Sequence, residues 1–302
     1  MATNNILVIG SSNTDMVIKS SRLPAPGETI LGGDFLMNPG GKGANQAVAA
    51  ARLGGSVNFI TKVGIDIFGQ AALEGLERHG INITYINKDE NTPSGVALIM
   101  VDGQGENSIS VALGANNTLS KSDLDNANKA FEKADYVLMQ LEIPLEAIQY
   151  ATQLAFINKA KVNLNPAPAQ NLPDDLVAKL YCITPNETEA TLLTGIKVTD
   201  DASAHQAALA LRAKGVSNVI ITMGSKGAYI LNDELATLIP TEKVNAVDTT
   251  AAGDTFNGAL VVGLSKGWGF LEAITFANKA AAYSVTKMGA QASTPTLEDL
   301  GM

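Results

Sequence analysis

The sequence has very little cysteine and histidine. Cys182 is the only cysteine among 302 residues, and His79 and His205 are the only histidines. A single cysteine excludes an intramolecular disulfide, which is typical of proteins in a reducing cytoplasm. These residue types are also too few for a zinc-type cluster. We therefore expect a cytoplasmic protein without a zinc centre.

A surplus of positive charge is also missing. There are 21 lysines and arginines against 30 aspartates and glutamates, so the net charge is −9. Because nucleic acids and anionic membranes both select basic surfaces, we expect no nucleic acid and no membrane among the partners. No segment approaches the ~18 apolar residues of a membrane span, and the stretch Met1–Asn5 lacks the basic region of a signal peptide.

Short apolar runs alternate with amphipathic patterns along the chain. Strands are predicted at Ile6–Ile9, Val57–Ile60, Tyr136–Leu141, Val162–Leu164, Tyr181–Ile183 and Val219–Met223. Helices are predicted at Gly43–Leu53, Phe68–His79, Ser122–Lys133, Leu145–Asn158, Ala202–Lys214, Gly253–Leu264 and Leu271–Thr286. This alternation favours an α/β fold, with a mostly parallel sheet and helices on both faces.

Two regions, 15–38 and 94–113, interrupt this alternation. Their β-like runs, such as Asp15–Lys19 and Val96–Val101, are joined by turns rich in Gly, Pro and Asp. We interpret them as a small separate sheet that forms a lid at one edge of the core. The alternative is two ordinary surface hairpins. No Pro/Ser-rich linker divides the chain, so residues 1–302 are expected to form one domain.

The most informative segment runs from Asp248 to Leu260. Two carboxylates, Asp248 and Asp254, flank a run of small residues that precedes an apolar helical pattern. Such a run leaves backbone N–H groups free at a helix N-terminus, where the helix dipole favours a phosphate. A carboxylate at that point can take a proton from a hydroxyl that attacks phosphorus. The alternative is that Asp254 only caps the helix.

A second glycine-rich segment, Gly40-Gly41-Lys42-Gly43-Ala44-Asn45, fits neither common nucleotide motif. It is not a Walker A loop, because Gly43 follows Lys42 where Ser or Thr is required. It is not a dinucleotide fingerprint, because Gln46 stands where the third glycine should be. Its small residues let a backbone approach a ligand closely. The alternative is a tight turn with a solvated lysine.

Polar residues follow several predicted strands. Asn13 and Asp15 come after the first strand, and Glu142 after the third. Ligands of α/β proteins bind at these carboxyl ends, and amide and carboxylate groups suit the hydroxyls of a sugar. The segment 184–189 can hold Mg²⁺ through water or complement a helix dipole. The segment 222–227 can wrap a phosphate tail or a ribose, or form a hairpin turn.

Together, the segments 40–47 and 248–260 resemble the two signatures of the ribokinase/PfkB family of carbohydrate kinases. The resemblance extends in order and spacing from Asn13 to Gln291. It implies a Rossmann-like core with a β-sheet lid and ATP-dependent phosphorylation of D-ribose at O5, giving ribose 5-phosphate and ADP. It also implies Mg²⁺ bound with ATP, K⁺ as an activating cation, and a homodimer formed through the lid.

The resemblance further implies a role for individual residues. Asp254 corresponds to the catalytic base, and Ala251, Ala252 and Gly253 correspond to the anion hole. The sugar pocket corresponds to Asn13, Asp15, Gly41, Lys42, Asn45 and Glu142, together with Asp254. The nucleotide contacts correspond to Asn186, Thr222, Gly224, Ser225, Lys226, Gly227, Gly253 and Asn278. Glu189 corresponds to a water-mediated Mg²⁺ ligand, and the monovalent cation site to Asp248, Thr250, Ser284, Lys287, Gly289 and Ser293.

Three alternatives to this activity stay open. The first is a kinase for another small sugar or a nucleoside. The second is a sugar-binding regulator that has lost catalysis, against which the intact Asp254 argues. The third is a dinucleotide oxidoreductase, which the missing fingerprint disfavours. The one departure from the general family pattern is Ala251, where many members have glycine.

Overall fold

The main sheet of the protein has eight strands. The computed structural model describes residues 5–302, so most of the polar N-terminal stretch, residues 1–4, lies outside it. The strand order is β14-β13-β12-β11-β10-β9-β1-β4. The bounds are β1 Asn5–Ile9, β4 Ser56–Ile60, β9 Tyr136–Met139, β10 Lys161–Leu164, β11 Cys182–Ile183, β12 Asn218–Thr222, β13 Ala228–Leu231 and β14 Ala236–Ile239. All neighbours are parallel except β12–β13 and β13–β14.

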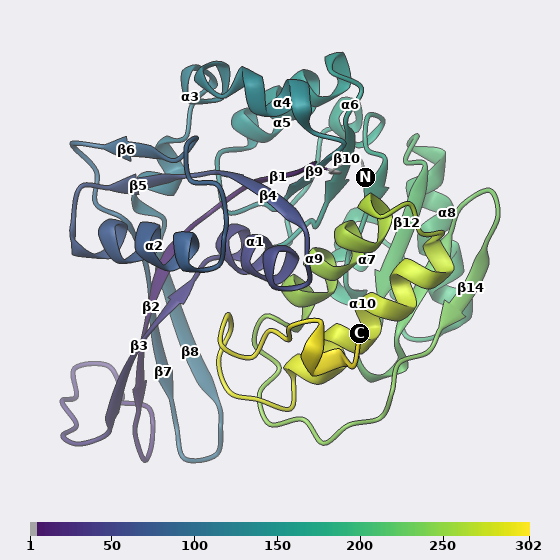
Figure 1. Cartoon of the computed structure of the whole chain (residues 1–302). Coiled ribbons are helices and arrows are strands. Elements are labelled where there is room, and N and C mark those ends of the chain that lie inside the picture. Colours follow the sequence, from purple (N-terminus) through teal and green to yellow (C-terminus); the bar gives the residue numbers. More distant parts are fainter. Residues whose placement is uncertain (1–4) are drawn as a thin grey trace.

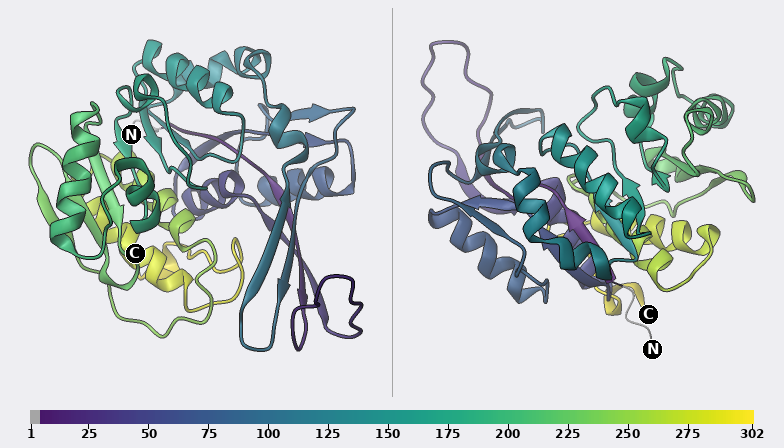
Figure 2. Two further views of the ribbon diagram at one scale, coloured as in Figure 1. Left: turned by 180° about the vertical axis from the view of Figure 1, so that it is seen from behind. Right: turned by 90° about the horizontal axis from the view of Figure 1, so that it is seen from above.

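Helices cover both faces of this sheet (Figures 1 and 2). One face packs against α1 (Lys42–Arg52), α2 (Ile67–Arg78), α9 (Ala252–Ser265) and α10 (Phe270–Ser284). The other packs against α3 (Lys121–Asn126), α4 (Asn128–Lys133), α5 (Leu145–Ile157), α6 (Asp174–Val177), α7 (Glu187–Thr194) and α8 (Asp201–Ala213). Along β1, Ile6 and Val8 belong to the first core, and Leu7 and Ile9 to the second. This alternation follows from the two-residue period of a strand. The Rossmann-like prediction is thus confirmed.

A second sheet projects from the core (Figure 1). Its order is β3-β2-β7-β8, with β2 at Asn13–Lys19, β3 at Asp34–Gly40, β7 at Gly95–Val101 and β8 at Asn107–Ala112. Strands β2 and β7 pair in parallel, which joins the two predicted regions into one sheet. The separate sheet is therefore confirmed, and the alternative of two independent hairpins is wrong. A two-stranded sheet, β5 (Lys62–Gly64) with β6 (Asn87–Asp89), was not predicted.

Several predicted boundaries differ from the structure. The strands predicted to reach Leu141, Met223 and back to Tyr181 are shorter at those ends. The helix predicted at 122–133 is two helices that meet at Ala127. Asparagines stand on both sides of Ala127, and asparagine is a weak helix former, which accounts for a break there. Three short 3₁₀ segments complete the described chain: η1 Gly114–Thr118, η2 Gly224–Lys226 and η3 Glu298–Leu300.

Between residues 5 and 302, no helix combines the length and the apolar character needed to cross a membrane.

Candidate active site

Asp254 lies in the first turn of α9 and is 5% exposed. Its Oδ2 accepts a hydrogen bond of 3.0 Å from Nδ2 of Asn45, and its Oδ1 accepts one of 3.0 Å from Nε2 of Gln46. Burial raises the pKa of Asp254, while the charge of Lys42 and the two amide donors oppose that rise. The carboxylate does not cap α9, so the helix-cap alternative is wrong for this residue. What remains is a buried, amide-held carboxylate whose affinity for a proton is increased, as a general base requires.

The glycine-rich segment lies directly against the polar start of β2. A Cβ atom on Gly40 would lie 2.2 Å from Oδ2 of Asp15, and one on Gly41 would lie 2.8 Å from the backbone nitrogen of Asn13. Gly41 also has φ 87°, which side-chain-bearing residues rarely adopt. Both glycines are therefore required for Asn13 and Asp15 to reach the start of α1. The structure brings Asn13, Asp15, Gly41 and Lys42 together, as the sequence predicted.

Glu142 follows β9, and its side chain reaches the start of α1. Its Oε2 accepts hydrogen bonds from Oγ of Ser11 at 2.5 Å and from the backbone nitrogen of Lys42 at 2.9 Å. Burial, together with the charges of Glu142 and Asp254, raises the pKa of Asp15 to about 6. The charges of three carboxylates therefore interact at this end of the sheet, and Lys42 lies among them.

Lys42 offsets the repulsion between these carboxylates. Burial lowers the pKa of its ammonium, but Asp254, Glu142 and Glu189 outweigh this effect, so the pKa is raised overall. Lys42 therefore remains positively charged at neutral pH. Lys42 therefore reduces the repulsion between the carboxylates and leaves a cation available to an anionic ligand.

The N-terminus of α9 is open to an anion. Ala251 precedes the helix in the left-handed conformation, with φ 58°, and within residues 5–302 no side chain caps this end. The first N–H groups of a helix lack intrahelical acceptors, and the helix dipole adds a partial positive charge. Ala252 and Gly253 open this turn, and Asp254 stands immediately after them. The nitrogen of Ala252 donates to the carbonyl of Thr249 at 3.3 Å, whereas the nitrogens of Gly253 and Asp254 have no backbone acceptor outside the helix among the described residues. The anion hole itself stays a prediction.

The predicted nucleotide residues form a second group. Asn186 and Thr222 are joined by a β-bridge, so the ends of β11 and β12 meet there. A Cβ on Gly227 would lie 2.2 Å from the carbonyl oxygen of Ile239, and Nδ2 of Asn278 donates to the same oxygen at 2.9 Å. The segment Gly224–Gly227, which includes Ser225 and Lys226, therefore lies beside Asn278.

Some polar groups in this second group are already engaged within the protein. Asn186 and Glu189 form a capping box at the start of α7: the Asn186 side chain accepts from the Glu189 nitrogen at 2.8 Å, and Oε2 of Glu189 accepts from the Asn186 nitrogen at 2.9 Å. Both residues therefore serve the N-terminus of α7, where the acidic side chain of Glu189 also complements the helix dipole. Nζ of Lys226 donates to the carbonyl of Thr199 at 2.7 Å. Glu189 retains one carboxylate oxygen for a water-mediated Mg²⁺ contact.

The Asp248 carboxylate links the loop before α9 to the segment after α10. Its Oδ1 accepts from the nitrogen of Thr250 at 2.9 Å, and its Oδ2 accepts from the nitrogen of Gly289 at 2.8 Å. The nitrogen of Val247 donates to the carbonyl of Val285 at 2.7 Å. The hydroxyls of Ser284 and Ser293 donate to the carbonyls of Ala281 and Ala290. These bonds connect Asp248 and Thr250 with the segment after α10, and the monovalent cation site stays a prediction.

Between residues 5 and 302, no three His, Cys, Asp or Glu side chains are grouped so that they could hold a metal ion by themselves.

Sequence reasoning missed four buried polar residues beside the site. They are Gln46, Gln140, Asn165 and Asn116. Gln46 was used only to exclude the dinucleotide fingerprint, although its position directly after Asn45 in the glycine-rich segment could have singled it out. The other three lie outside every motif, and no signal in one sequence marks them.

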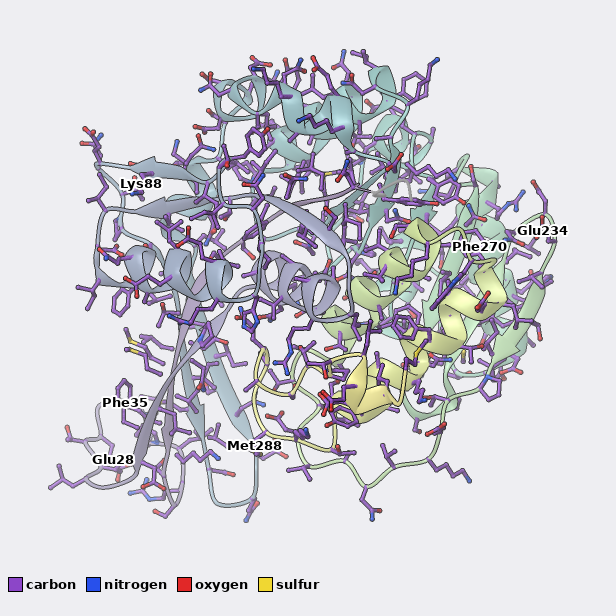
Figure 3. All side chains as sticks on the ribbon, viewed as in Figure 1. Glu28, Phe35, Lys88, Glu234, Phe270 and Met288 are labelled. Carbon is purple, nitrogen blue, oxygen red and sulfur yellow. The ribbon has the colours of Figure 1, made fainter. Side chains whose placement is uncertain are left out.

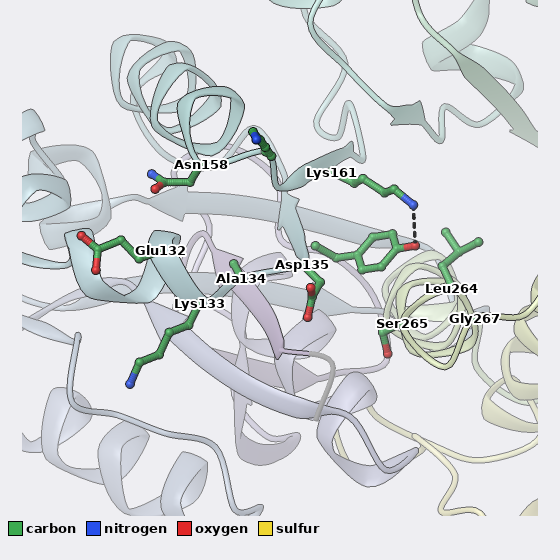
Figure 4. A pocket seen from close by; sticks show the side chains of 11 residues that line it. Glu132, Lys133, Ala134, Asp135, Asn158, Lys161, Leu264, Ser265 and Gly267 are labelled. Atoms are coloured by element: carbon green, nitrogen blue, oxygen red, sulfur yellow. Dashed lines mark hydrogen bonds between the residues drawn. The ribbon is translucent and has the colours of Figure 1, made fainter. Parts of the chain in front are cut away.

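A cavity of about 470 Å³ lies elsewhere (Figure 4). Its lining comes from the residues before β9, the turn after α5 and the end of α9, and it contains none of the predicted site residues. Nζ of Lys161 donates to the hydroxyl of Tyr136 there at 3.3 Å. Because catalytic groups of α/β proteins gather at the carboxyl ends of the strands, we assign the site to the Asp254 cluster.

Comparison with known proteins agrees with this geometry. The family model described as "pfkB family carbohydrate kinase" matches residues 3–297. The chain is 46% identical to a ribokinase of Haemophilus influenzae over 97% of this chain and 96% of the relative. It is 41% identical to a deoxyribokinase of Salmonella typhi over 97% and 96%. The structure of Arabidopsis thaliana ribokinase complexed with ribose and ATP superposes with a TM-score of 0.92 at 31% identity, covering 99% of this chain and 98% of that one. The chain belongs to the pfkB family of carbohydrate kinases.

Proposed function

We propose that this protein transfers the γ-phosphoryl group of ATP to O5 of D-ribose, giving ribose 5-phosphate and ADP. The observation that carries the proposal is the buried Asp254 carboxylate. It stands at the open N-terminus of α9 and is joined through Asn45 to the glycine-rich segment that contacts Asn13 and Asp15. The similarity to relatives named ribokinase supports ribose as the sugar.

The protein's own groups account for the chemistry. The sugar hydroxyls pair with Asn13, Asp15, Asn45 and Glu142, which places O5 beside Asp254. Asp254 takes the O5 proton as O5 forms its bond to the γ-phosphorus and the bond from that phosphorus to the β–γ bridging oxygen breaks. The N–H groups at the start of α9 stabilise the negative charge on the transferring group. The proton then leaves Asp254 for solvent.

Two cations fit the residues present. Glu189 would hold Mg²⁺ through water, and the ion, bound with ATP, would neutralise charge on the phosphate oxygens. K⁺ would be held by Asp248, Thr250 and the oxygens of the segment containing Ser284, Lys287, Gly289 and Ser293. There it would fix the loop that carries the N–H donors.

The small sheet supports two further proposals, that it is a lid over the sugar and that two copies join through it. Ile18, Phe35, Met37 and Leu98 lie on one of its faces, as the strand register shows, and are 42–60% exposed. Phe35 lies on the part of the sheet that projects beyond the core (Figure 3). An exposed apolar face of this kind suits a second copy of the chain. A dimer mass in solution that Phe35→Asp reduces to a monomer mass would support this; a monomer in both would exclude it.

We also propose that residues 1–302 form a single domain and that the protein works in the cytoplasm.

A coupled ADP-release assay tests the proposed function. Ribose, 2-deoxyribose, fructose and adenosine should be compared at equal concentration. We expect the highest kcat/KM for ribose, because a pocket built to pair hydroxyls rejects ligands that leave polar groups unpaired. A higher value for 2-deoxyribose would assign the protein to the activity of its deoxyribokinase relative. Absence of ADP release with every acceptor, together with measurable ribose binding, would favour the catalytically silent regulator.

A further inference from the structure

Gln46 is fully buried in α1 and contacts the Asp254 carboxylate. Its Nε2 donates to Oδ1 of Asp254 at 3.0 Å and to Oδ1 of Asn165 at 3.1 Å. Its Oε1 accepts from Nε2 of Gln140 at 2.5 Å. One side-chain amide therefore has three side-chain partners, and the only charged one is the Asp254 carboxylate.

The hydrogen-bonded series of side chains ends on two groups that fix the orientation of its amides, the Asp254 carboxylate and the carbonyl of Thr184. An ionised carboxylate and a backbone carbonyl can only accept hydrogen bonds. Nδ2 of Asn165 donates to the carbonyl of Thr184 at 3.1 Å, so Oδ1 of Asn165 faces Gln46. Gln46 must then present its NH₂ group to both Asn165 and Asp254, which leaves its Oε1 for Gln140. A rotated Gln46 amide would place oxygen against oxygen at two contacts.

The absence of a side chain at Gly10, just after β1, leaves room for the side chain of Gln140. A Cβ atom on Gly10 would lie 2.2 Å from Oε1 of Gln140. The Gln140 side chain is 0% exposed, and its Oε1 has no hydrogen-bond partner among the described residues. An unpartnered buried acceptor costs free energy. Only the Nε2 group of Gln140 is hydrogen-bonded, so the role of this side chain is its donation to Gln46.

We propose that Gln46 is a positioning residue that, supported by Gln140, holds the Asp254 carboxylate through a hydrogen bond and so keeps it ionised for proton removal. This proposal rests on the proposed function of Asp254 as general base. Gln46 would not touch the substrate. It would act only through the carboxylate that it binds.

The charges around Asp254 explain why a neutral donor is suited to this task. Burial raises its pKa, and Glu142 raises it further, whereas Lys42, Asn45 and Gln46 lower it. Asp15 and Glu189 also interact with the Asp254 charge. A second cation in place of Gln46 would stabilise the carboxylate so strongly that it would become a weak base. An amide keeps it ionised while preserving its basicity.

The test uses Gln46→Leu, which keeps the side-chain volume and removes the donor. The pH dependence of kcat should be measured at saturating ribose, because Asp15, whose pKa is raised to about 6, is proposed to bind the sugar. The loss of a donor raises the pKa of Asp254. The acid limb of the profile should therefore move upward by about one pH unit, a fall of about tenfold on that limb. On the alkaline plateau, kcat should return to within about twofold of wild type. Gln140→Leu should move the limb in the same direction by less.

Asn163→Leu is the matched control. Asn163 is also a buried amide, 1% exposed, but it bonds only the carbonyl of Lys161, at 3.3 Å, and has no link to Asp254. Both substitutions remove a buried amide, so thermal unfolding should be recorded for all variants. We expect an unchanged acid limb for Asn163→Leu. A Gln46→Leu profile that superimposes on wild type, or one lowered by the same factor at every pH, would overturn the proposal.

A second readout separates this proposal from the proposed function. Carboxyl ¹³C NMR titration of the free protein, with the Asp254 signal assigned by Asp254→Asn, follows the proton on Asp254 without any substrate. An upward move of its midpoint in Gln46→Leu supports the proposal even if ribose is not the substrate. An unmoved midpoint contradicts it even if ribose is phosphorylated.

Discussion

Nδ2 of Asn116 donates a hydrogen bond of 2.7 Å to Oδ1 of Asn13. The same side chain bonds the backbone of Ser12, accepting from its nitrogen at 2.9 Å and donating to its oxygen at 3.2 Å. Because Oδ1 of Asn13 is occupied, Asn13 offers its NH₂ group to a sugar. Asn116 lies in η1, just after β8, so it links the entry and the exit of the small sheet.

Asn116→Leu should therefore weaken ribose binding more than catalysis. We expect KM for ribose to rise about tenfold, the equivalent of ~1.4 kcal/mol, with kcat within about threefold of wild type. Steady-state kinetics and calorimetric titration with ribose measure both quantities. Thr152→Val, which removes a buried hydroxyl in α5 that bonds the carbonyl of Ile148, is the control and should leave KM unchanged. An unaltered KM in Asn116→Leu would contradict the orienting role.

Ribose affinity should fall as the pH drops through the pKa of Asp15. That pKa is raised from 3.8 to about 6 by burial and by the charges of Glu142 and Asp254. Above pH 6 the carboxylate accepts hydrogen bonds from sugar hydroxyls strongly, and below pH 6 its protonated form accepts them weakly. Kd for ribose should therefore increase several-fold, roughly 3- to 10-fold, between pH 7 and pH 5.

Asp15→Asn serves as the control for this pH effect. Its ribose affinity should be lower at pH 7 and nearly constant from pH 5 to pH 7. The same pH slope in wild type and in Asp15→Asn would show that another group is responsible.

K⁺ should raise the rate, and Asp248→Ala should remove most of that response. Asp248 holds the nitrogens of Thr250 and Gly289 together, so a cation at this carboxylate would fix the loop that leads into α9. Preorganised donors contribute about 2.7–4 kcal/mol each, so even partial loss should lower kcat about tenfold or more. Initial rates should be compared in KCl and in tetramethylammonium chloride at equal ionic strength. Equal wild-type rates in the two salts would exclude the activating site.

Gly43 should be required for folding rather than for chemistry alone. A Cβ atom there would lie 2.5 Å from the nitrogen of Ser11 and 2.6 Å from the carbonyl carbon of Gly10, and neither backbone atom can move easily. We expect Gly43→Ala to cost about 1–3 kcal/mol. Gly75→Ala, inside α2 with only Arg78 at 3.7 Å, should instead stabilise by about 0.5–1 kcal/mol. Urea unfolding followed by the fluorescence of Trp268, the single tryptophan, measures both, and equal effects would refute the close-packing explanation.

Much of the fold was predictable because its signals are local. Continuous apolar runs such as Ile6–Ile9 mark buried strands, and the turn-rich segments around Asp15 and Val96 marked the second sheet. The pairing of β2 with β7 was not predictable in the same way, since a parallel pair between distant segments leaves no local trace. The break at Ala127 was missed because the amphipathic pattern continues across it.

The residues of the candidate site were likewise predictable only where a local sequence motif marks them. Asp254, Asn45 and the glycines stand in two short motifs whose chemistry is visible in the sequence. Gln140, Asn165 and Asn116 come from three other parts of the chain and act through contacts that only the tertiary structure creates. The capping box of Asn186 and Glu189 illustrates a further limit, because the same residues serve a helix end and lie close to a candidate nucleotide site.

The most direct test of the account is the reaction of wild type and Asp254→Asn with ATP and D-ribose, followed by ³¹P NMR under chemistry-limited conditions. We expect wild type to form ribose 5-phosphate and ADP in equal amounts. Asp254→Asn should bind ribose with nearly unchanged affinity and react roughly 10²- to 10⁴-fold more slowly, because it lacks the general base. A near wild-type rate in Asp254→Asn, or a product phosphorylated at a position other than O5, would contradict the assignment of Asp254 as the base beside O5.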